Sequence, residues 1–178
     1  MPTNIACVLL LFVFALSASA DQSDELAKIN ELLDGFHQAA ADGDEARYLG
    51  YFADDGVFMG TDDWERWPLD DFREYVHSRF SGGGGWTYTS EERHIAFSQD
   101  GHTAWFDEIM VSERWGRFRG TGVLTHEAGG QETGSQENGG WKLAHYSLTA
   151  LVPNERFEDV SAIANEGFEA RKQAETPN

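Results

Sequence analysis

The sequence predicts an α+β domain in which a curved antiparallel sheet packs on three N-terminal helices, with a further helix at the C-terminus. In the first part of the chain, apolar residues recur at intervals of three and four, the period of a helix with one buried face. From residue 86 onward they alternate with polar residues, which is the period of a strand. Helices that come first and strands that follow, without alternation, indicate the α+β class.

Three helices are predicted before the sheet. The first extends from Ser23, which can cap its start, to Asp42-Gly43, which ends it. Asp44 can cap a second, short helix. A short strand from Val57 to Gly60 follows the turn sequence ADDG, and Pro68 is placed to begin the third helix. The inward-facing residues predicted for these helices are Leu26, Ile29, Leu33, Phe36, Ala40, Leu49, Phe52, Leu69, Phe72, Val76 and Phe80.

Four strands are predicted after the glycine run Gly82–Gly85, which no helix continues through. The Asp-Gly pair in QDGH is a strong hairpin signal between the first two strands. A polar, glycine-rich loop, residues 128–140, separates the last two. The predicted strands are Trp86–Ser98, Thr103–Glu113, Arg117–Glu127 and Trp141–Val152.

The last segment, residues 154–178, is distinct from the domain predicted for residues 21–153. Phe157, Val160, Ala164 and Phe168 fit one face of an amphipathic helix, which would pack either on the sheet or on a partner. The remaining tail, KQAETPN, is predicted to be disordered.

The first twenty residues, 1–20, have the pattern of a secretory signal peptide. They carry no charged side chain, contain an apolar run from Ile5 to Leu16, and end in Ala18-Ser19-Ala20, an A-x-A cleavage motif. The run is too short to span a bilayer well and no Lys or Arg precedes it, so cleavage is favoured over an uncleaved membrane anchor. We therefore expect a periplasmic or secreted protein with no membrane association after cleavage.

The composition of the chain excludes several classes of function. The chain has 178 residues, enough for one ordinary domain. Its only cysteine is Cys7, so the mature chain can form no disulfide and bind no metal through sulfur. A formal net charge of -18 repels nucleic acids and anionic lipids. Metal and cofactor motifs are also absent, so we predict no metal, no cofactor and no nucleic-acid partner.

Several segments resemble one protein family. The segments are FADDGVFMGTDDWERW, GGGGWTYTSEERHIAFSQDG, TAWFDEIMVSE, RGTGVL and GWKLAHYSLTALVPNE. They span about residues 24–157 and resemble the SnoaL-like branch of the nuclear transport factor 2-like superfamily. The resemblance implies a cone of bent sheet closed by three helices, a hydrophobic cavity entered near Gly60 to Trp67, and a homodimer formed through the outer face of the sheet. It implies no single activity, because the superfamily includes isomerases, dehydratases, cyclases and non-catalytic domains.

Ketosteroid isomerases of this superfamily use an aspartate base and a tyrosine that donates to an oxyanion. The resemblance puts Phe36 where the tyrosine would stand and Gly60 where the base would stand. A phenyl ring cannot donate a hydrogen bond and a glycine cannot take a proton, so isomerisation at these positions is not supported. Asp62 is a candidate displaced base; the alternative is that Asp62 and Asp63 form a turn.

Two acids in one predicted strand are further catalytic candidates. Asp107 and Glu108 lie on opposite faces, each embedded among apolar residues, so one of them should be buried or should border the cavity. The alternative is a carboxylate paired across strands with Arg93, Arg117 or Arg119. Periodicity alone does not say which face points into the cone.

His145 in the last predicted strand is the remaining catalytic candidate. It shares its predicted face with Leu143 and Ser147, an unusually polar set beside a core. In the fold that the resemblance implies, this strand runs along the cavity wall, where a histidine would orient a ligand or act as a base. The alternative is a structural histidine.

The chain has six tryptophans, and most cluster before or within the predicted sheet. Aromatic side chains with a few polar groups suit a pocket for a flat apolar molecule, but they equally suit a core or a dimer interface. Trp115 is expected at the surface or in an interface. The candidate ligand-binding residues are Trp64, Trp67, Trp86, Tyr88, Trp105 and Arg119.

These observations support two functions. The first is binding of a small, mostly apolar molecule in the cavity, with or without acid/base turnover of the isomerase or lyase type. The second is a non-catalytic oligomerisation or accessory domain, in which the aromatic residues only fill the core. A cavity of ligand size would favour the first, and a completely filled cone the second.

Overall fold

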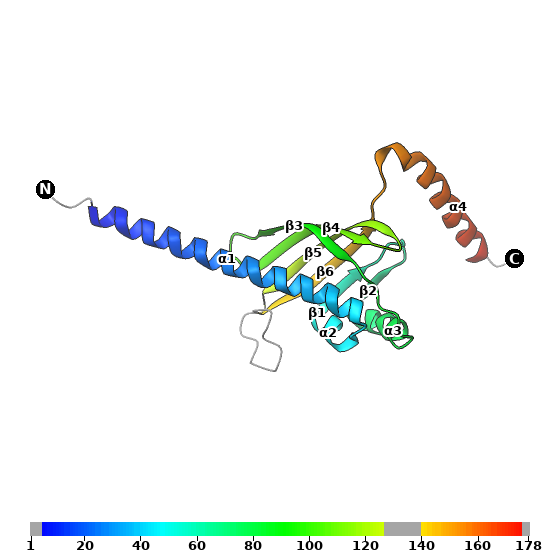
Figure 1. The fold of residues 1–178 in the computed structure, drawn as a ribbon, viewed down its shortest axis with the longest axis horizontal. Coiled ribbons are helices and arrows are strands. Elements are labelled where there is room, and N and C mark those ends of the chain that lie inside the picture. Colours follow the sequence, from blue (N-terminus) through cyan, green and yellow to red (C-terminus); the bar gives the residue numbers. More distant parts are fainter. Residues whose placement is uncertain (1–4, 127–139, 176–178) are drawn as a thin grey trace.

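The computed structural model describes residues 5–126 and 140–175 and confirms the predicted α+β fold (Figure 1). A six-stranded sheet, in the order β2-β1-β6-β5-β4-β3, packs against three helices. The helices are α1 (Ile5–Asp42), α2 (Glu45–Gly50), α3 (Leu69–Phe80) and, after the sheet, α4 (Phe157–Glu175). The strands are β1 (Phe52–Met59), β2 (Arg66–Pro68), β3 (Thr89–Phe97), β4 (Thr103–Ser112), β5 (Gly116–His126) and β6 (Trp141–Ala150). Residues 128–139 of the predicted polar loop lie outside the described residues.

Helix α1 lies across one face of the sheet and is longer than predicted (Figure 1). It begins at Ile5, not at Ser23, because no glycine or proline interrupts the chain between them. Gly43, with a φ of 68°, ends it as predicted. Signal cleavage after Ala20 stays a prediction. Within the described parts of the chain, no helix is long and apolar enough to cross a membrane.

The segment that follows α1 agrees with the prediction in part. Asp44 caps α2, because its Oδ1 accepts a hydrogen bond from the backbone N–H of Arg47 at 3.1 Å. Strand β1, however, begins at Phe52 instead of Val57, and its parallel pairing with β6 shifts register between these two residues. The predicted ADDG turn is therefore an irregularity inside a strand. The short strand β2 beside β1 was not predicted.

The four predicted strands of the meander are all present, with ends no more than three residues from the predicted ones. Burial along β4 shows which face of the sheet turns toward the helices. Phe106, Glu108 and Met110 are buried, whereas Trp105 and Asp107 are exposed. The even-numbered residues of β4 therefore line the inside of the cone.

Aromatic rings make up much of the core between the helices and the sheet. Phe58 of β1 stacks on Phe72 of α3 with ring centroids 4.2 Å apart, and Phe36 of α1 stacks on Tyr48 of α2 at 4.6 Å. Each such pair adds about 0.5–1.5 kcal/mol beyond the burial of its area. Phe36, at the position of the tyrosine in ketosteroid isomerases, is thus a core residue. The buried aromatic residues are Phe36, Tyr48, Tyr51, Phe52, Phe58, Phe72, Phe80, Phe106, Phe118, Trp141 and Tyr146.

Helix α3 follows the predicted pattern. Pro68 stands immediately before its first residue, Leu69, and the buried face is the predicted one. Asp70 and Asp71 occupy the first turn, where acidic side chains interact favourably with the helix dipole.

Helix α4 stands apart from the sheet (Figure 1). It follows a short 3₁₀ turn, Asn154–Arg156, and continues to Glu175. Lys172 to Glu175, which belong to the tail predicted as disordered, are therefore helical; Lys, Gln, Ala and Glu are all good helix formers. Residues 176–178 lie outside the described residues.

Replacing Gly85 by Ala is expected to destabilise the domain by about 1–3 kcal/mol, because a Cβ there would overlap the carbonyl oxygen of Ala40 at the end of α1. Gly84→Ala is the matched control, since its Cβ would lie 3.6 Å from the carbonyl oxygen of Arg79, an ordinary contact. Urea unfolding followed by tryptophan fluorescence measures both. Equal stabilities of the two variants would contradict this account of the close approach.

Candidate functional site

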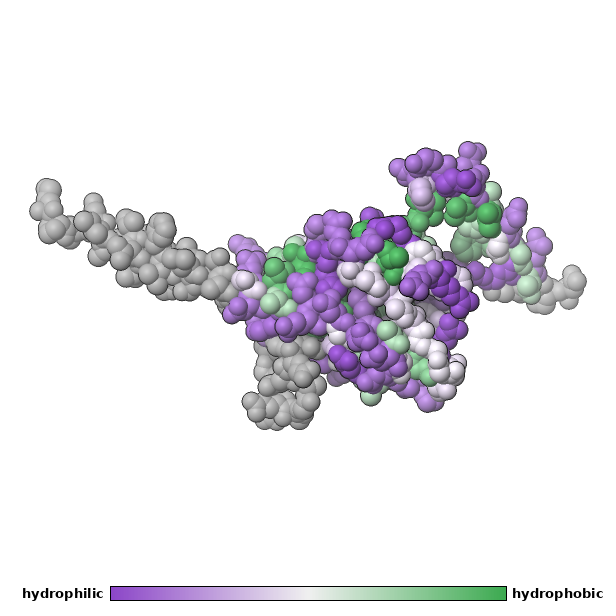
Figure 2. All heavy atoms as spheres, viewed as in Figure 1, coloured by the Kyte–Doolittle hydropathy of each residue, from purple (hydrophilic) through white to green (hydrophobic). Residues whose placement is uncertain are grey.

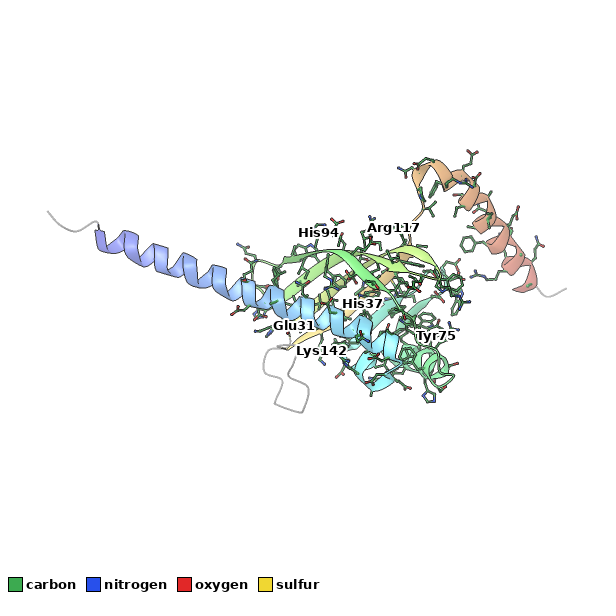
Figure 3. The ribbon with its side chains drawn as sticks, in the orientation of Figure 1. Glu31, His37, Tyr75, His94, Arg117 and Lys142 are labelled. Carbon is green, nitrogen blue, oxygen red and sulfur yellow. The ribbon has the colours of Figure 1, made fainter. Side chains whose placement is uncertain are left out.

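A pocket of about 430 Å³ opens between α3, the β1–β2 segment and the ends of β5 and β6. This volume lies within the range of small-molecule sites, roughly 300–1,000 Å³. Tyr75, labelled on α3 in Figure 3, marks the side of the domain where it lies. The lining residues are Phe58, Gly60, Thr61, Glu65, Trp67, Tyr75, Arg79, Trp86, Tyr88, Trp115, Phe118, Leu148 and Ala150.

Near-parallel rings form one wall of the pocket. Trp67 stacks on Tyr75 at 4.6 Å with an interplanar angle of 22°, and on Phe58 at 6.1 Å with an angle of 29°. The ring of Trp86 lies 6.2 Å from that of Tyr75 with a tilt of 32°. Offset rings at these separations attract one another, so a flat ligand would extend the existing stack as a further layer.

The carboxylate of Glu65 occupies the space that a side chain at Gly60 would need. A Cβ at Gly60 would overlap the Glu65 carboxylate, while the backbone N–H of Gly60 donates to the Glu65 carbonyl at 2.9 Å. The Oε2 of Glu65 also accepts a hydrogen bond from the backbone N–H of Asp62 at 3.1 Å. The glycine at the isomerase base position therefore lets a carboxylate five residues later fold back into the pocket.

Two further polar groups reach the pocket. The guanidinium of Arg79 lies 6.0 Å from the centroid of the Tyr75 ring. Among the described residues, no carboxylate lies within ion-pair distance of Arg79. Burial is the main cause that raises the pKa of Tyr88, and the electrostatic interaction with Tyr75 raises it further. The Tyr88 hydroxyl therefore stays protonated and is available as a hydrogen-bond donor.

The predicted ligand-binding residues divide into two groups. Trp67, Trp86 and Tyr88 line the pocket. Trp105 and Arg119 are exposed on the other face of the sheet, as their alternation with the buried residues of β4 and β5 shows. Trp115, predicted to lie at the surface or in an interface, is 65% exposed, in agreement with a surface position, and it also lines the pocket as a rim residue.

Trp64 is 58% exposed and does not line the pocket. Its ring meets the ring of Trp67 edge-on, with centroids 5.5 Å apart. Trp64 therefore supports the pocket wall from outside, through Trp67.

The pocket lining does not include His145, so of the two alternatives left by the sequence the geometry favours a structural histidine. Across β5 and β6, Leu124 pairs with Leu143 but Val123 pairs with His145, so Ala144 is an extra residue that reverses the side-chain alternation. Leu143 is buried, whereas His145 lies on the outer face with its Nε2 3.2 Å from the Sδ of Met59. Asp107 is likewise exposed on that outer face.

Asp62 forms part of a turn, the alternative that the sequence left open. The backbone carbonyl of Asp62 accepts from the N–H of Glu65 at 3.1 Å. Its carboxylate lies outside the pocket lining and accepts two hydrogen bonds from Arg171, at 2.9 and 3.0 Å. Desolvation opposes ionisation of Asp62, but the hydrogen bonds from Arg171 and Asp63 outweigh it, so its pKa lies below the usual value.

Glu108 is fully buried, and both of its carboxylate oxygens have side-chain partners, His37 and Arg93. His37 Nε2 lies 2.7 Å from its Oε1, and Arg93 Nε donates to its Oε2 at 2.9 Å, so the cross-strand pairing foreseen for one of the two acids is present. Arg93 Nη1 also donates to Asp34 of α1 at 2.9 Å. Burial opposes ionisation of Glu108, but His37 and Arg93 outweigh it, so its pKa lies below the usual value. Glu108 does not line the pocket, and its interactions join α1 to the sheet.

Sequence reasoning missed several pocket residues, notably Glu65, Tyr75 and Arg79. Tyr75 and Arg79 stand four residues apart on α3, a spacing that puts two side chains on the same face, and this was the available signal. Glu65 gave no signal, because only the fold of the turn brings its carboxylate over Gly60. Across the residues that the structure describes, no group of three or more His, Cys, Asp or Glu side chains is arranged to hold a metal ion.

A sheet curved into a cone, closed by helices and open at a pocket, defines the class of nuclear transport factor 2-like domains. The model of the SnoaL-like domain family matches residues 29–153, and the chain belongs to that family. Comparison with curated proteins finds no match.

Solved structures share the fold at low sequence identity. A domain of unknown function with a cystatin-like fold from Nostoc punctiforme is 14% identical with a TM-score of 0.62, covering 85% of this chain and 92% of that chain. A nuclear transport factor 2-like protein from Pseudomonas putida is 15% identical with a TM-score of 0.55, covering 72% and 88%. Another from Cytophaga hutchinsonii is 16% identical with a TM-score of 0.51, covering 69% and 95%. At these identities the similarity shows the fold alone.

Glu108→Gln is expected to lower the free energy of unfolding at pH 7 by about 3 kcal/mol, the lower end of the range for a broken buried ion pair, because it leaves the nearly buried Arg93 with the exposed Asp34 as its charged partner. Asp107→Asn, one residue away on the exposed face, is the matched control and should change stability little. Chemical denaturation at pH 7 measures both variants.

The ion pair of Glu108 and Arg93 also predicts how the stability of the domain depends on pH. Because the folded-state pKa of Glu108 lies below its ordinary value of 4.5, its contribution to stability is present above 4.5 and is lost as pH falls through the folded-state pKa. Wild-type protein should therefore lose stability more steeply than Glu108→Gln as the solution is acidified below pH 4.5. Parallel stability–pH curves for the two proteins would contradict the assignment.

Proposed function

We propose that this SnoaL-like domain is a periplasmic or secreted protein that binds a small, flat, mostly apolar molecule in its aromatic pocket. The observation that carries this proposal is the pocket of about 430 Å³ walled by the near-parallel rings of Trp67 and Tyr75. A site that only completed a core would be filled, because protein interiors leave few voids larger than a water molecule. Here the aromatic core is buried, and the pocket beside it is open.

The polar groups of the pocket favour a ligand with one polar or anionic substituent. Arg79 offers a planar set of N–H donors that no described carboxylate occupies, and such a fork suits a carboxylate or sulfonate. Glu65 already accepts a backbone hydrogen bond through Oε2. A flat ring system stacked on the pocket wall, with an acidic group toward Arg79, matches both features.

Binding is better supported than acid/base turnover. Asp107 and His145 lie on the outer face, Asp62 is paired with Arg171, and Glu108 is held by buried partners. Among the described residues, Glu65 is the one carboxylate that lines the pocket. Isomerase- or lyase-type chemistry would require Glu65 to act without a partner acid in the pocket.

We also propose a homodimer formed through the outer face of the sheet. Trp105 is 49% exposed there, and Ile109 and Val111 of the same strand are only partly buried. A face of this composition is typical of a protein–protein interface. Ligand binding and dimerisation use opposite faces of the sheet, so the two proposals are compatible.

Trp115→Ala is expected to weaken binding of the neutral fluorophore N-phenyl-1-naphthylamine by about 5–30-fold, because the variant loses one exposed aromatic wall of the pocket without opening the core. Trp105→Ala removes an exposed tryptophan from the opposite face and is the matched control. It should leave the affinity within about twofold while reducing the dimer fraction in light scattering. Equal affinity losses in both variants, or no binding by the wild type, would overturn the proposal.

Arg79→Ala tests the anionic substituent. It should weaken binding of 8-anilinonaphthalene-1-sulfonate by about 5–10-fold and change binding of the neutral N-phenyl-1-naphthylamine by less than about twofold. Arg66→Ala, which removes an exposed arginine that does not line the pocket, controls for net charge. An equal loss of affinity for both fluorophores would show that Arg79 does not interact with the negative charge of the ligand.

A further inference from the structure

Helix α4 carries an apolar stripe with an arginine in line with it. Phe157, Val160, Ala164 and Phe168, here called the apolar stripe, are spaced by three and four residues, and Arg171 follows three residues later. At 100° per residue all five lie within about 80° of one another around the helix. Arg171 therefore points to the same side as the stripe.

Arg171 fixes which way the stripe faces. Its Nη1 donates to Asp63 Oδ1 at 2.8 Å, and its Nη2 donates to Asp62 Oδ1 at 2.9 Å, both in the turn between β1 and β2. Because Arg171 reaches the domain, the apolar stripe is turned toward the domain as well. In Figure 2 the hydrophobic residues of α4 gather on the side turned toward the sheet, and hydrophilic residues cover its outer side.

The two ends of α4 are anchored beside the pocket on different elements. Before α4, the chain leaves β6 through Ala150, which lines the pocket, and the backbone N–H of Leu151 donates to the carbonyl of Arg117 at 2.9 Å. After the stripe, Arg171 binds the turn whose flanking residues Thr61 and Glu65 line the pocket. The helix thus runs from one part of the pocket rim to another.

The stripe is turned toward the domain but is not packed against it. Phe157, Val160 and Phe168 are 63%, 41% and 42% exposed. An amphipathic helix held by an ion pair at one end and by the chain at the other, with its apolar face open, leaves space for an apolar body between itself and the pocket rim.

We propose that α4 is the outer wall of the ligand site: a flat apolar molecule in the pocket is covered by the apolar stripe, with Phe168 as the main contact, and Arg171 holds the helix in place. The inference rests on the proposed binding function and adds binding residues to it. The Arg171 pair is half-exposed, so it is worth little enough to release when ligand enters or leaves. The apolar stripe contacts the bound molecule, and the ion pairs of Arg171 with Asp62 and Asp63 determine the position of the helix.

Phe168→Ala tests the contact with the ligand. In stopped-flow measurements on the full chain, it should speed release of N-phenyl-1-naphthylamine by about 5–10-fold. Ile163→Ala is the matched control, because Ile163 is 70% exposed on α4 and lies outside the stripe; it should change release by less than about twofold. Circular dichroism confirms that both variants keep their helix content.

Arg171→Ala tests the anchor. Freeing the end of α4 should speed both association and release by about 2–5-fold, the range expected for a half-exposed ion pair. Arg156→Ala removes an equal charge whose ion pair, among the residues that the structure describes, is with Asp159 of α4, and should change neither rate. Raising the salt to 0.5 M should bring wild-type rates close to those of Arg171→Ala, because an exposed pair is screened.

The outcomes separate the two proposals. If Trp115→Ala weakens binding while Phe168→Ala and Arg171→Ala behave like their controls, α4 is not part of the site and this inference fails, whereas the binding function stands. If the wild type binds neither fluorophore, the binding function itself fails. A fall in molar mass caused by Phe168→Ala would show that a second copy covers the stripe, which also overturns the inference.

Discussion

The stacked rings of Phe58 and Phe72 connect the fold to its pocket. Phe58 belongs to β1 and Phe72 to α3, so their 4.2 Å contact holds the helix against the sheet. Phe58 also stacks on Tyr146 in the next strand at 5.5 Å, and Phe72 continues the near-parallel set toward Trp67 and Tyr75. Rings gain both apolar burial and favourable ring–ring electrostatics in this arrangement. The same stack therefore begins in the buried core, at Phe72, and continues to the rings of Trp67 and Tyr75, which line the pocket.

Two arginines of this acidic chain form ion pairs that differ in burial. Arg93 is nearly buried and binds a fully buried carboxylate, Glu108, so separating them would leave Arg93 with the exposed Asp34 as its remaining charged partner among the described residues. Arg171 binds the carboxylates of Asp62 and Asp63 at a site that water reaches, so that pair contributes little to stability. The buried pair joins β3 to β4 and is extended to α1 by His37 and Asp34, whereas the Arg171 pair holds α4 to the domain by a partly exposed contact.

Periodicity predicted the fold class, helix α3 and the four meander strands, and the clustering of aromatic residues predicted three of the pocket residues, Trp67, Trp86 and Tyr88. It succeeded there because each of these segments alternates regularly between buried and exposed positions. It was wrong about the face of His145, because the extra residue Ala144 in β6 reverses the alternation, and a single inserted residue leaves no mark on composition or local propensity. The start of β1 was misplaced for a similar reason, since an irregular stretch interrupts its pairing with β6.

The sequence by itself determined the order and period of the elements, the strongly acidic charge, and the absence of a tyrosine at Phe36 and of an acid at Gly60. These are properties of single residues or of neighbours along the chain. Only the tertiary structure decided which polar groups line the pocket. The wall of the pocket combines α3, the β1–β2 segment, β5 and β6, which are far apart in the sequence and share no sequence pattern that would predict their contact. Glu65 reaches the pocket because Gly60 has no side chain to exclude it, and Arg171 reaches Asp62 only because α4 returns along the domain.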